Sequence, residues 1–314
     1  MQIPKCNTTP YAHDPYPSRV KPVPETLPRR DPVVYSEWTV QSPLTRAQVE
    51  AYARDGFLTL RNLLSPSEVA CLQREMAALR RHGPASNPAL SIQEPGNGDV
   101  RSIFKVHETS PVFARLAADR RLIDIARFLL GDDVYIHQSR LNFKPAFRGK
   151  EFYWHSDFET WHVEDGMPRM RALSMSVILT PNHDCNGPLM LIAGSHTSYI
   201  ACVGETPDDH YKQSLKKQEY GVPDDASLLR LAQAGGIATP KGPAGTVVLF
   251  DCNVMHGSNS NITPYARSNV FIVYNALSNR LVAPFGGKPP RPDFLAARGK
   301  PRPLDGVERE RPIR

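Results

Sequence analysis

The chain has 314 residues, of which 40% are hydrophobic, and a formal net charge of +6. This length and composition are enough to bury a sizeable core and favour one elaborated domain over two. No hydrophobic run is long enough to cross a bilayer and the N-terminus has no hydrophobic signal core, so we expect a cytoplasmic protein with no membrane partner.

The positive charge is concentrated near the C-terminal end. Residues 286–314 hold eight Lys or Arg against four Asp or Glu, so this segment supplies +4 of the net +6. The rest of the chain is nearly balanced and shows no basic stripe interleaved with aromatic side chains, which nucleic-acid grooves require. The sequence therefore predicts no nucleic-acid partner.

The cysteines indicate no structural role. They are scattered, odd in number and without a C-x-x-C pair, which favours neither a disulfide framework nor a thiolate zinc site. We expect reduced, inert thiols at Cys6, Cys71, Cys185, Cys202 and Cys252.

The first part of the chain is an arm followed by a helix. Residues 1–43 contain nine prolines and few hydrophobic clusters, which predicts an arm that lies on the domain or is partly disordered. Thr45 and Gln48 form a T-x-x-Q capping box. We expect a helix from there to Arg54 that stops at Gly56.

A second helix follows a short strand. Residues 57–60 are typical of a strand, and Ser65 with Pro66 marks the start of a helix that runs to about Arg81. The segment 84–97 is rich in Pro, Asn, Gly and Ser, which predicts a loop. A further helix is expected over 120–130, with Gly131 as its stop, so the first 130 residues are expected to be mainly helical support.

After Gly131 the pattern becomes strand-like. Seven short stretches are rich in β-branched or aromatic residues and are bounded by Gly, Pro, Asn or Asp. They are 134–137, 140–144, 152–154, 172–180, 189–192, 246–250 and 269–275. Short strands in series predict a mainly β fold with flanking helices, as a double-sheet jelly roll or barrel.

One long insertion interrupts the series of strands. It covers 204–245, and its section 224–233 has a helical pattern. Because a loop of this size on a compact domain is more often functional than decorative, we expect a lid or an interface there.

The chemistry is expected around His155, Ser156 and Asp157, in the aromatic stretch 152–171. In an extended segment residues two apart point the same way, so His155 and Asp157 can share one ligand. With a distant second histidine they form the 2-His-1-carboxylate set that holds Fe(II) and leaves positions open. An H-x-D pair alone is more often a surface or hydrogen-bonded pair, so its surroundings must decide.

The second histidine is expected at His256. It directly follows a hydrophobic strand and precedes Gly257 and Ser258, where the backbone can approach a ligand closely. His196 also follows a buried strand and is interpreted as a pocket or core residue. His183 and His210 lie in polar loops and are expected to be solvated.

Arg267 comes eleven residues after His256. An arginine offers a planar fork of donors that binds a carboxylate in bidentate fashion, which a lysine reproduces poorly. An iron site that uses 2-oxoglutarate needs such a group for the far carboxylate. The spacing of His155, Asp157, His256 and Arg267 is therefore a compound signal for such a site.

The stretch 152–172 resembles the diagnostic segment of the ectoine hydroxylases, a group in the phytanoyl-CoA dioxygenase-like family of non-haem iron, 2-oxoglutarate-dependent oxygenases. The resemblance covers nearly the whole chain from residue 14 to about residue 298. Further matching segments are DPYPSR (14–19), RRDPVVY (29–35), VRSIF (100–104), VYIHQSRLNFKP (134–145), NGPLMLIAGSH (186–196), DHYKQSLKKQE (209–219), FDCNVMHGSNSNITP (250–264) and RSNVFIVYN (267–275).

The resemblance assigns roles to residues of this chain. It implies iron ligands at His155, Asp157 and His256. It implies that Arg267 anchors the distal carboxylate of 2-oxoglutarate, with the site completed by Gln138, Asn142, Lys144 and Ser258.

The resemblance also implies a substrate pocket for ectoine, a small zwitterionic carboxylate with an amidinium-like ring. Aromatic faces suit such a ring through cation-π and stacking contacts, and an Arg or amide suits its carboxylate. The implied pocket residues are Gln138, Arg140, Trp161, Phe250, Asn269 and Phe271.

The implied protein is an enzyme with a double-stranded β-helix core of the jelly-roll, cupin-like kind, assembled as a homodimer. It would hydroxylate ectoine to 5-hydroxyectoine in compatible-solute biosynthesis, using Fe(II), 2-oxoglutarate and O2 and releasing succinate and CO2. Its expected parts are an arm (1–43), one oxygenase domain (44–298) and a basic tail (299–314). Within the domain we expect helical support (44–131) and a jelly-roll core (132–280), and the core carries the insertion (204–245).

Two alternatives stay open at this point. One is a related oxygenase that acts on another small cationic or zwitterionic solute. The other is a cupin-like protein that binds a metal or ligand without turnover. Succinate release that depends on ectoine distinguishes all three readings.

Overall fold

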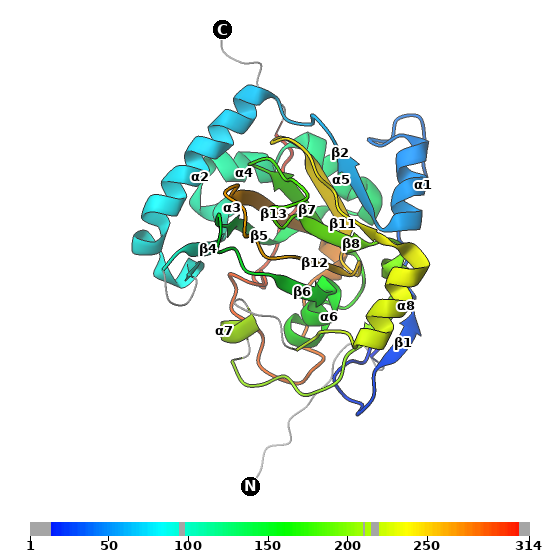
Figure 1. Ribbon diagram of the computed structural model, residues 1–314. Coiled ribbons are helices and arrows are strands. Elements are labelled where there is room, and N and C mark those ends of the chain that lie inside the picture. The colour runs from blue at the N-terminus through cyan, green and yellow to red at the C-terminus, as the bar shows by residue number, and fades with distance from the viewer. Residues whose placement is uncertain (1–13, 94–97, 210, 215–219, 308–314) are drawn as a thin grey trace.

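Two antiparallel sheets face each other at the centre of the molecule (Figure 1). The computed structural model describes residues 14–93, 98–209, 211–214 and 220–307. The larger sheet has seven strands in the order β2 (Phe57–Leu60), β11 (Val247–Asp251), β7 (Ala172–Ile178), β13 (Arg267–Ala276), β5 (Val134–Lys144), β4 (Val100–Phe104) and β3 (Ser91–Gln93).

The smaller sheet has four strands. Their order is β10 (Ile237–Ala238), β8 (Leu189–Ile192), β12 (His256–Ser258) and β6 (Phe152–His155). Hydrophobic side chains of both sheets meet between them, as expected when two sheets pack face to face. This inner cluster contains Ile178, Leu189, Leu191, Val248, Phe250, Val254 and Phe271. The predicted mainly β, jelly-roll fold is confirmed.

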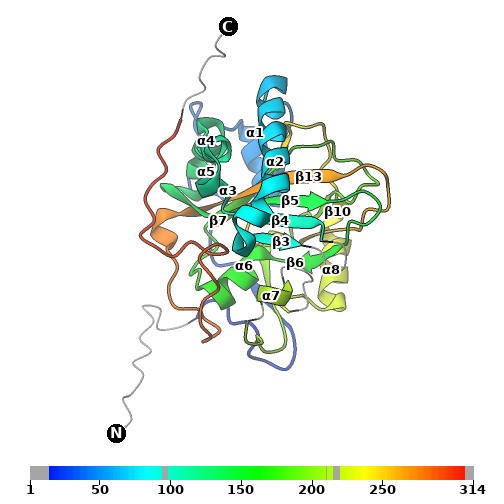
Figure 2. The same ribbon diagram turned by 90° about the vertical axis from the view of Figure 1, so that its left-hand side faces the viewer.

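Helices cover the outer face of the larger sheet. Figure 2 shows α1 (Arg46–Asp55), α4 (Pro111–Ala117) and α5 (Arg120–Leu130) on one side of this sheet and β6 on the other, with α2 (Pro66–Ser86) crossing in front of its strands. Their buried side chains form one hydrophobic cluster with those of the sheet, which includes Leu72, Phe113, Ile123, Leu141, Met175, Leu249 and Val270. These helices thus support the sheet that carries the site, to which the first 130 residues also contribute β2, β3 and β4.

The remaining elements are short. The helices are α3 (Val106–Thr109), α6 (Asp157–Thr160), α7 (Tyr211–Ser214) and α8 (Asp225–Gly235). Helix α6 continues into one π-helical turn (Trp161–Asp165). Single 3₁₀ turns cover Pro88–Leu90, Ser195–Thr197 and Leu277–Asn279. Two further strands, β1 (Glu25–Pro28) and β9 (Ser198–Ala201), pair with each other.

The helix starts follow the sequence prediction. In α1 the Thr45 side chain accepts from the backbone of Gln48 and the Gln48 side chain accepts from the backbone of Thr45, and Gly56 ends the helix at φ 83°. Ser65 and Glu68 make the same reciprocal pair at the start of α2. Each box satisfies backbone N–H groups that have no partner within the helix.

Several boundaries differ from the prediction. Helix α2 runs on to Ser86, past the expected end near Arg81. The expected loop over 84–97 is therefore wrong for the end of α2, and also for 88–90, which form a 3₁₀ turn, and for 91–93, which form β3. Residues 94–97 lie outside the described residues. Residues 134–144 form one continuous strand because all eleven pair with or border β13. Strands β3, β4 and β12 and helices α3 and α4 were not predicted, since each is too short to show a clear period.

The N-terminal segment lies on the domain from residue 14 onward. Strand β1 pairs with β9 between Glu25 and Ala201, and the ring of Tyr16 is fully buried. Residues 1–13, with Cys6 and His13, lie outside the described residues, as does His210. The four described cysteines are free thiols. None of the described helices is long and apolar enough to cross a membrane.

Candidate active site

Strands β6 and β12 bring the two predicted histidines face to face. They pair antiparallel, and their register places His256 directly opposite His155. Strand β6 ends at His155, Ser156 stays extended, and Asp157 begins helix α6. The carboxylate therefore lies two residues beyond one imidazole and beside the other.

The three side chains form a compact donor set. The Asp157 Oδ1 atom lies 3.7 Å from the Nε2 atoms of both His155 and His256, and one donor atom from each of the three residues lies within 4.8 Å of the others. Across the described residues this is the group that could hold a metal ion. Two imidazoles and one carboxylate are the ligands of a non-haem Fe(II) site.

Hydrogen bonds orient the two imidazoles for this task. The Nδ1 atom of His155 lies 2.8 Å from the carbonyl oxygen of Tyr153, and Nδ1 of His256 lies 3.0 Å from that of Val254. A ring nitrogen beside a carbonyl oxygen carries the proton, so each Nε2 is left unprotonated as a ligand atom. The donor set thus fits Fe(II).

Electrostatics favour the same protonation state. Burial, and then the proximity of His256, lower the pKa of His155 to about 3, so this imidazole is neutral at physiological pH. Ser174 on β7 donates from Oγ to Asp157 Oδ2 over 3.2 Å. Asp157 is therefore held by one oxygen, and its other oxygen faces the histidines.

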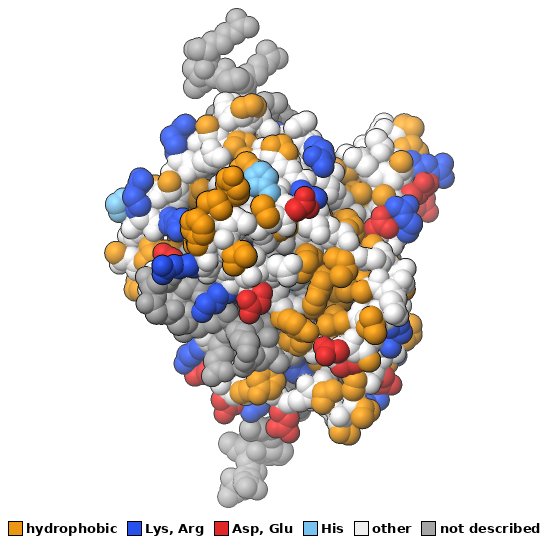
Figure 3. Space-filling model, viewed as in Figure 1, with side chains coloured by type: hydrophobic (Ala, Val, Ile, Leu, Met, Phe, Trp, Pro, Cys, Tyr) orange, Lys and Arg blue, Asp and Glu red, His pale blue; other side chains and the backbone are white. Residues whose placement is uncertain are grey.

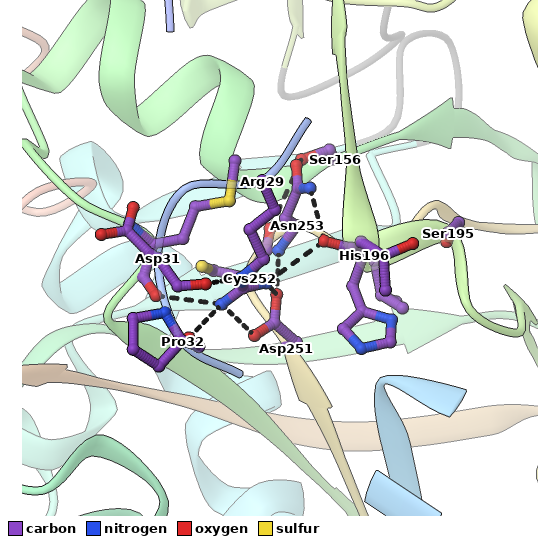
Figure 4. Close-up of polar contacts among 12 residues, drawn as sticks. Arg29, Asp31, Pro32, Ser156, Ser195, His196, Asp251, Cys252 and Asn253 are labelled. Atoms are coloured by element: carbon purple, nitrogen blue, oxygen red, sulfur yellow. Dashed lines mark hydrogen bonds and ion pairs between the residues drawn. The ribbon is translucent and has the colours of Figure 1, made fainter. Parts of the chain in front are cut away.

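A buried polar network holds the backbone around the three residues (Figure 4). Arg29 donates to both carboxylate oxygens of Asp251, over 2.8 and 3.0 Å, and Asp251 accepts from the backbone of Asn253. The Asn253 side chain accepts from Ser156 Oγ and donates to the carbonyl oxygens of His196 and Ser198. This network ties the segment before His256 to the residue between His155 and Asp157.

His196 serves the scaffold. Its ring is fully buried and Nε2 lies 3.1 Å from the carbonyl oxygen of Ala53. Figure 4 shows its imidazole pointing away from the polar network, which it contacts through its carbonyl oxygen. The core interpretation of His196 fits this position, and the structure leaves His256 as the partner of His155.

One cavity adjoins both histidines and Arg267. Its walls come from β4, β5, β6, β8, β12 and β13, through Arg101, Ser102, Phe104, Arg140, Asn142, Phe152, His155, Leu189, His256, Gly257, Ser258, Arg267 and Phe271. A second hollow shares Arg267 and adds Lys144 and Lys150. Among the described residues, no Asp or Glu lines either space, so the cavity beside the metal ligands is strongly cationic.

Strand pairing explains why these residues meet. In the register of β13 with β5, Arg267 lies opposite Lys144, Asn269 opposite Asn142 and Phe271 opposite Arg140. Because alternate residues of a strand share a face, all six point to the inner side of the larger sheet.

Arg267 is buried, with 5% of its surface exposed, and its Nε atom has no hydrogen-bond partner in the protein. Burial lowers the pKa of Arg267 to about 10, so the guanidinium stays protonated at neutral pH. A buried charge of this kind is costly unless something pairs with it. A dicarboxylate ligand would supply that partner.

The other residues assigned to 2-oxoglutarate divide into two groups. Asn142 and Ser258 line the cavity, and Lys144 donates to Ser258 Oγ over 2.8 Å and to the carbonyl oxygen of Asn259. Gln138 is also buried, and it donates to the carbonyl oxygen of Leu295 over 2.8 Å. Gln138 is not among the residues that line either hollow.

The residues assigned to the substrate are also divided. The guanidinium of Arg140 lies 5.2 Å above the ring of Phe271, and both line the cavity. The ring of Phe250 lies 5.0 Å from that of His256, and Asn269 donates to Ser176 Oγ over 3.0 Å.

Trp161 lies in a hydrophobic cluster beyond α6, with Phe158, Met167 and Met170 among its neighbours. The structure thus brings Arg140 and Phe271 to the cavity wall and Phe250 to His256. Trp161, with 4% of its surface exposed, is not among the residues that line either hollow.

Several residues of the site were not singled out from the sequence. Arg101 and Phe104 reach the cavity from β4, and Phe152 reaches it from β6. All three lie in segments that carry the family resemblance, VRSIF and FYWHSD, but their own pattern is that of ordinary buried strands. Only the pairing of β4 with β5 shows that this strand borders the site.

Comparisons with known proteins identify the family of the chain. The family model described as phytanoyl-CoA dioxygenase (PhyH) matches residues 52–269. The ectoine dioxygenase of Sphingopyxis alaskensis is 62% identical over 291 residues, which cover 93% of this chain and 95% of that protein.

Solved structures of EctD from S. alaskensis are similar over the whole fold. The structure with 2-oxoglutarate and 5-hydroxyectoine has a TM-score of 0.87 and 55% identity, and covers 94% of this chain and 99% of that chain. The structure with bound Fe has a TM-score of 0.86 at the same identity and coverage. The chain therefore belongs to the phytanoyl-CoA dioxygenase (PhyH) family, in the group that contains the ectoine dioxygenases.

Proposed function

We propose that this protein is an ectoine dioxygenase, which hydroxylates ectoine to 5-hydroxyectoine and converts 2-oxoglutarate and O2 to succinate and CO2. The observation that carries the proposal is one cavity lined by both candidate iron-binding histidines and by the buried Arg267. The S. alaskensis protein, described in complex with 2-oxoglutarate and 5-hydroxyectoine, supports it.

The enzyme uses Fe(II), and in this proposal His155, Asp157 and His256 hold it. Fe(II) with bound 2-oxoglutarate supplies the activation of O2. The protein keeps both Nε2 atoms unprotonated through the carbonyl oxygens of Tyr153 and Val254, and Ser174 holds Asp157 in place. Because these groups are fixed before substrate arrives, little reorganisation is needed on binding.

The cationic part of the cavity is the site for the co-substrate. Arg267 is assigned to the distal carboxylate because its fork suits bidentate binding. Asn142 and Ser258 lie beside it as hydrogen-bonding groups, and Lys144 contributes charge and orients Ser258. Gln138 is assigned to both the co-substrate site and the substrate site.

The aromatic part of the cavity is the site for ectoine. Trp161, Phe250 and Phe271 are assigned to the amidinium-like ring, to which each can offer an aromatic face. Arg140 and Asn269 are assigned to the substrate carboxylate. The Arg140 Nε and Asn269 Oδ1 atoms are buried without a hydrogen-bond partner in the protein, and a zwitterionic ligand offers both an acceptor and donors for them.

Three further expectations belong to this proposal: a homodimer, a cytoplasmic location, and the division into arm, oxygenase domain and tail. Hydrophobic side chains gather in patches on the face in Figure 3. A shallow groove is lined by Tyr153, Trp154, Leu229 and Ile237, among others, and Leu229 and Ile237 are more than half exposed. A second copy of the chain could cover such a surface.

The test is the product formed from ectoine. The purified protein is incubated with ectoine, 2-oxoglutarate, Fe(II) and air, and we expect one oxygen atom added to ectoine for each succinate released. Omitting Fe(II) and adding a chelator should abolish both products. Succinate that forms equally without ectoine would favour another substrate, and no succinate with any small zwitterionic solute would favour a binding protein without turnover.

A further inference from the structure

His137 occupies an irregular position in the strand that carries the site. In the pairing of β5 with β13, Gln138 lies opposite Val273 and Ile136 lies opposite Tyr274, so His137 is an extra residue in a β-bulge. A bulge re-aims a side chain that would otherwise follow the alternation of the strand. His137 thus interrupts the order that puts Gln138 and Arg140 on the inner face.

The imidazole of His137 is buried without a hydrogen-bond partner in the protein. Only 1% of the residue is exposed, and neither Nδ1 nor Nε2 has a partner. Buried polar groups in folded proteins nearly always have a hydrogen-bond partner, and a bound ligand is one group that can provide it for these ring nitrogens. The Thr160 Oγ1, Arg140 Nε and Asn269 Oδ1 atoms share this condition.

One neighbour of His137 is Trp161, which the proposed function assigns to the substrate pocket. Its ring centroid lies 5.0 Å from that of Trp161, with the rings tilted by 66°. Nε2 lies 3.8 Å from Asp165 Oδ2, which is too long for a hydrogen bond. Asp165 is already bound by Arg291, over 2.8 and 2.5 Å, so His137 is left to another partner.

The protonation state and tautomer of His137 follow from its surroundings. Burial, and then the charge of Arg291, lower the pKa of His137 to about 3, so the ring is neutral at physiological pH. The Asp165 carboxylate on the Nε2 side favours the tautomer with its proton on Nε2. Nδ1 is then a bare acceptor, suited to a donor and unsuited to a carboxylate.

We propose that Nδ1 of His137 accepts a hydrogen bond from an N–H of the substrate's amidinium ring, so that His137 is a specificity-determining residue. The inference rests on the proposed function and adds to it a polar contact for the end of the substrate opposite its carboxylate. Solutes of similar size without an amidinium N–H would leave Nδ1 unpaired and bind less tightly.

Two variants of the full-length protein test the proposal. His137→Phe keeps a ring of similar volume and removes both nitrogens, whereas His137→Asn keeps an acceptor near the position of Nδ1. We measure KM for ectoine, KM for 2-oxoglutarate, succinate formed without ectoine, and Tm with and without ectoine. The wild-type protein is assayed in parallel, because a wild type that does not couple succinate to ectoine overturns the proposed function itself.

For His137→Phe we expect the ectoine KM to rise about tenfold, as for one lost hydrogen bond, with the 2-oxoglutarate KM within about twofold of wild type. Its Tm without ectoine should be equal or higher, because an unpaired polar group is removed from the interior, and ectoine should raise it less. His137→Asn should recover part of the ectoine affinity.

Other results would overturn the inference. If wild type is active and His137→Phe has an unchanged ectoine KM, His137 does not contact the substrate. A lower Tm with the usual response to ectoine identifies a structural role. Should His137→Phe fail to fold, His137→Asn still decides. The proposal is contradicted if His137→Asn raises the KM for ectoine and does not discriminate against solutes that lack the amidinium N–H.

Discussion

At the scale of single residues, neighbouring groups fix the orientation of the three candidate metal ligands and so determine which of their atoms are available to a metal. His155 and His256 each turn Nδ1 toward a carbonyl oxygen two residues earlier in the chain. Asp157 is held by Ser174. Such outer contacts determine which atoms a metal meets, and they are as much a part of the site as the ligands.

Replacing Asp157 with alanine should abolish hydroxylation and weaken Fe(II) binding by at least about a hundredfold, because the carboxylate between the two imidazoles is lost. Ser174→Ala should have a smaller effect of about tenfold on Fe(II) affinity. Both are measured by Fe(II) titration and by succinate release. Asp184→Ala, at a largely exposed carboxylate, is the control, and undiminished turnover in Asp157→Ala would remove Asp157 from the metal site.

Replacing Arg267 with alanine should raise the KM for 2-oxoglutarate by about 10- to 100-fold, as for the loss of a charge-assisted hydrogen bond, and leave the KM for ectoine nearly unchanged. Arg267→Lys keeps the charge without the planar fork and should fall between the two. Steady-state kinetics with each substrate varied in turn measure this split. An unchanged dependence on 2-oxoglutarate would contradict the assignment.

At the scale of elements, the long pair β5 and β13 presents alternating polar side chains to the cavity, and the helices behind them bury the opposite face of the same sheet. The position of the sheet therefore depends on helices that never touch the site. Helix α2 is the longest of them, with 21 residues, and its start is held by Ser65 and Glu68.

Ser65→Ala should lower the free energy of unfolding by about 1 kcal/mol, because the Glu68 N–H loses its acceptor. The effect is measured by urea unfolding, with Arg74→Ala at an exposed position of the same helix as the matched control.

Burial alone would raise the pKa of Glu68, but hydrogen bonds from Arg121 and Ser65 outweigh it and lower that pKa to about 2.

Since the folded pKa of Glu68 lies below the ordinary 4.5, its contribution to stability is complete above that value and declines as the pH falls toward 2. Glu68→Gln should therefore lose stability at neutral pH and come closer to wild type in acid. An equal difference at both pH values would show that the charge of Glu68 does not matter. Exposure to solvent keeps this effect small.

At the scale of the whole molecule, distant segments of the chain meet around α6. Arg19 of the N-terminal segment pairs with Glu159 and Glu164 over 2.7 Å each, and all three side chains are almost fully buried. From the other end of the chain, Arg291 binds Asp165. The helix that begins with Asp157 is thus held by both terminal regions.

Arg19→Ala should destabilise the protein by about 3–5 kcal/mol, because it leaves buried carboxylates without their partner, and should weaken Fe(II) binding through a less ordered α6. Arg46→Ala removes an exposed pair with Glu50 and should change stability by less than about 0.5 kcal/mol. Denaturant unfolding of both variants measures the difference. Equal stability of the two would show that Arg19 does not anchor the segment.

Much of this protein can be predicted from local sequence. The capping box at Thr45, the helix start at Ser65, the strand series after Gly131 and the fold class were correct. Boundaries and short elements were less predictable: the extension of α2 to Ser86 and the strands β4 and β12 depend on partners elsewhere in the chain. The residue roles within the site stay predictions, although the structure brings most of them to one cavity.

The sequence by itself determined what a few neighbouring residues can encode: helix starts, strand periods, and the spacing that lets His155 and Asp157 share a ligand. The sequence also favoured His256, about a hundred residues later, as the second histidine, but only the tertiary structure decided that it lies directly opposite His155 and that His196 is a core and not a pocket residue. It also decided that His137 sits in a bulge without a partner. The reason is physical, because side-chain periodicity is a local steric property, whereas register and burial are set by strands that meet only when the whole sheet forms.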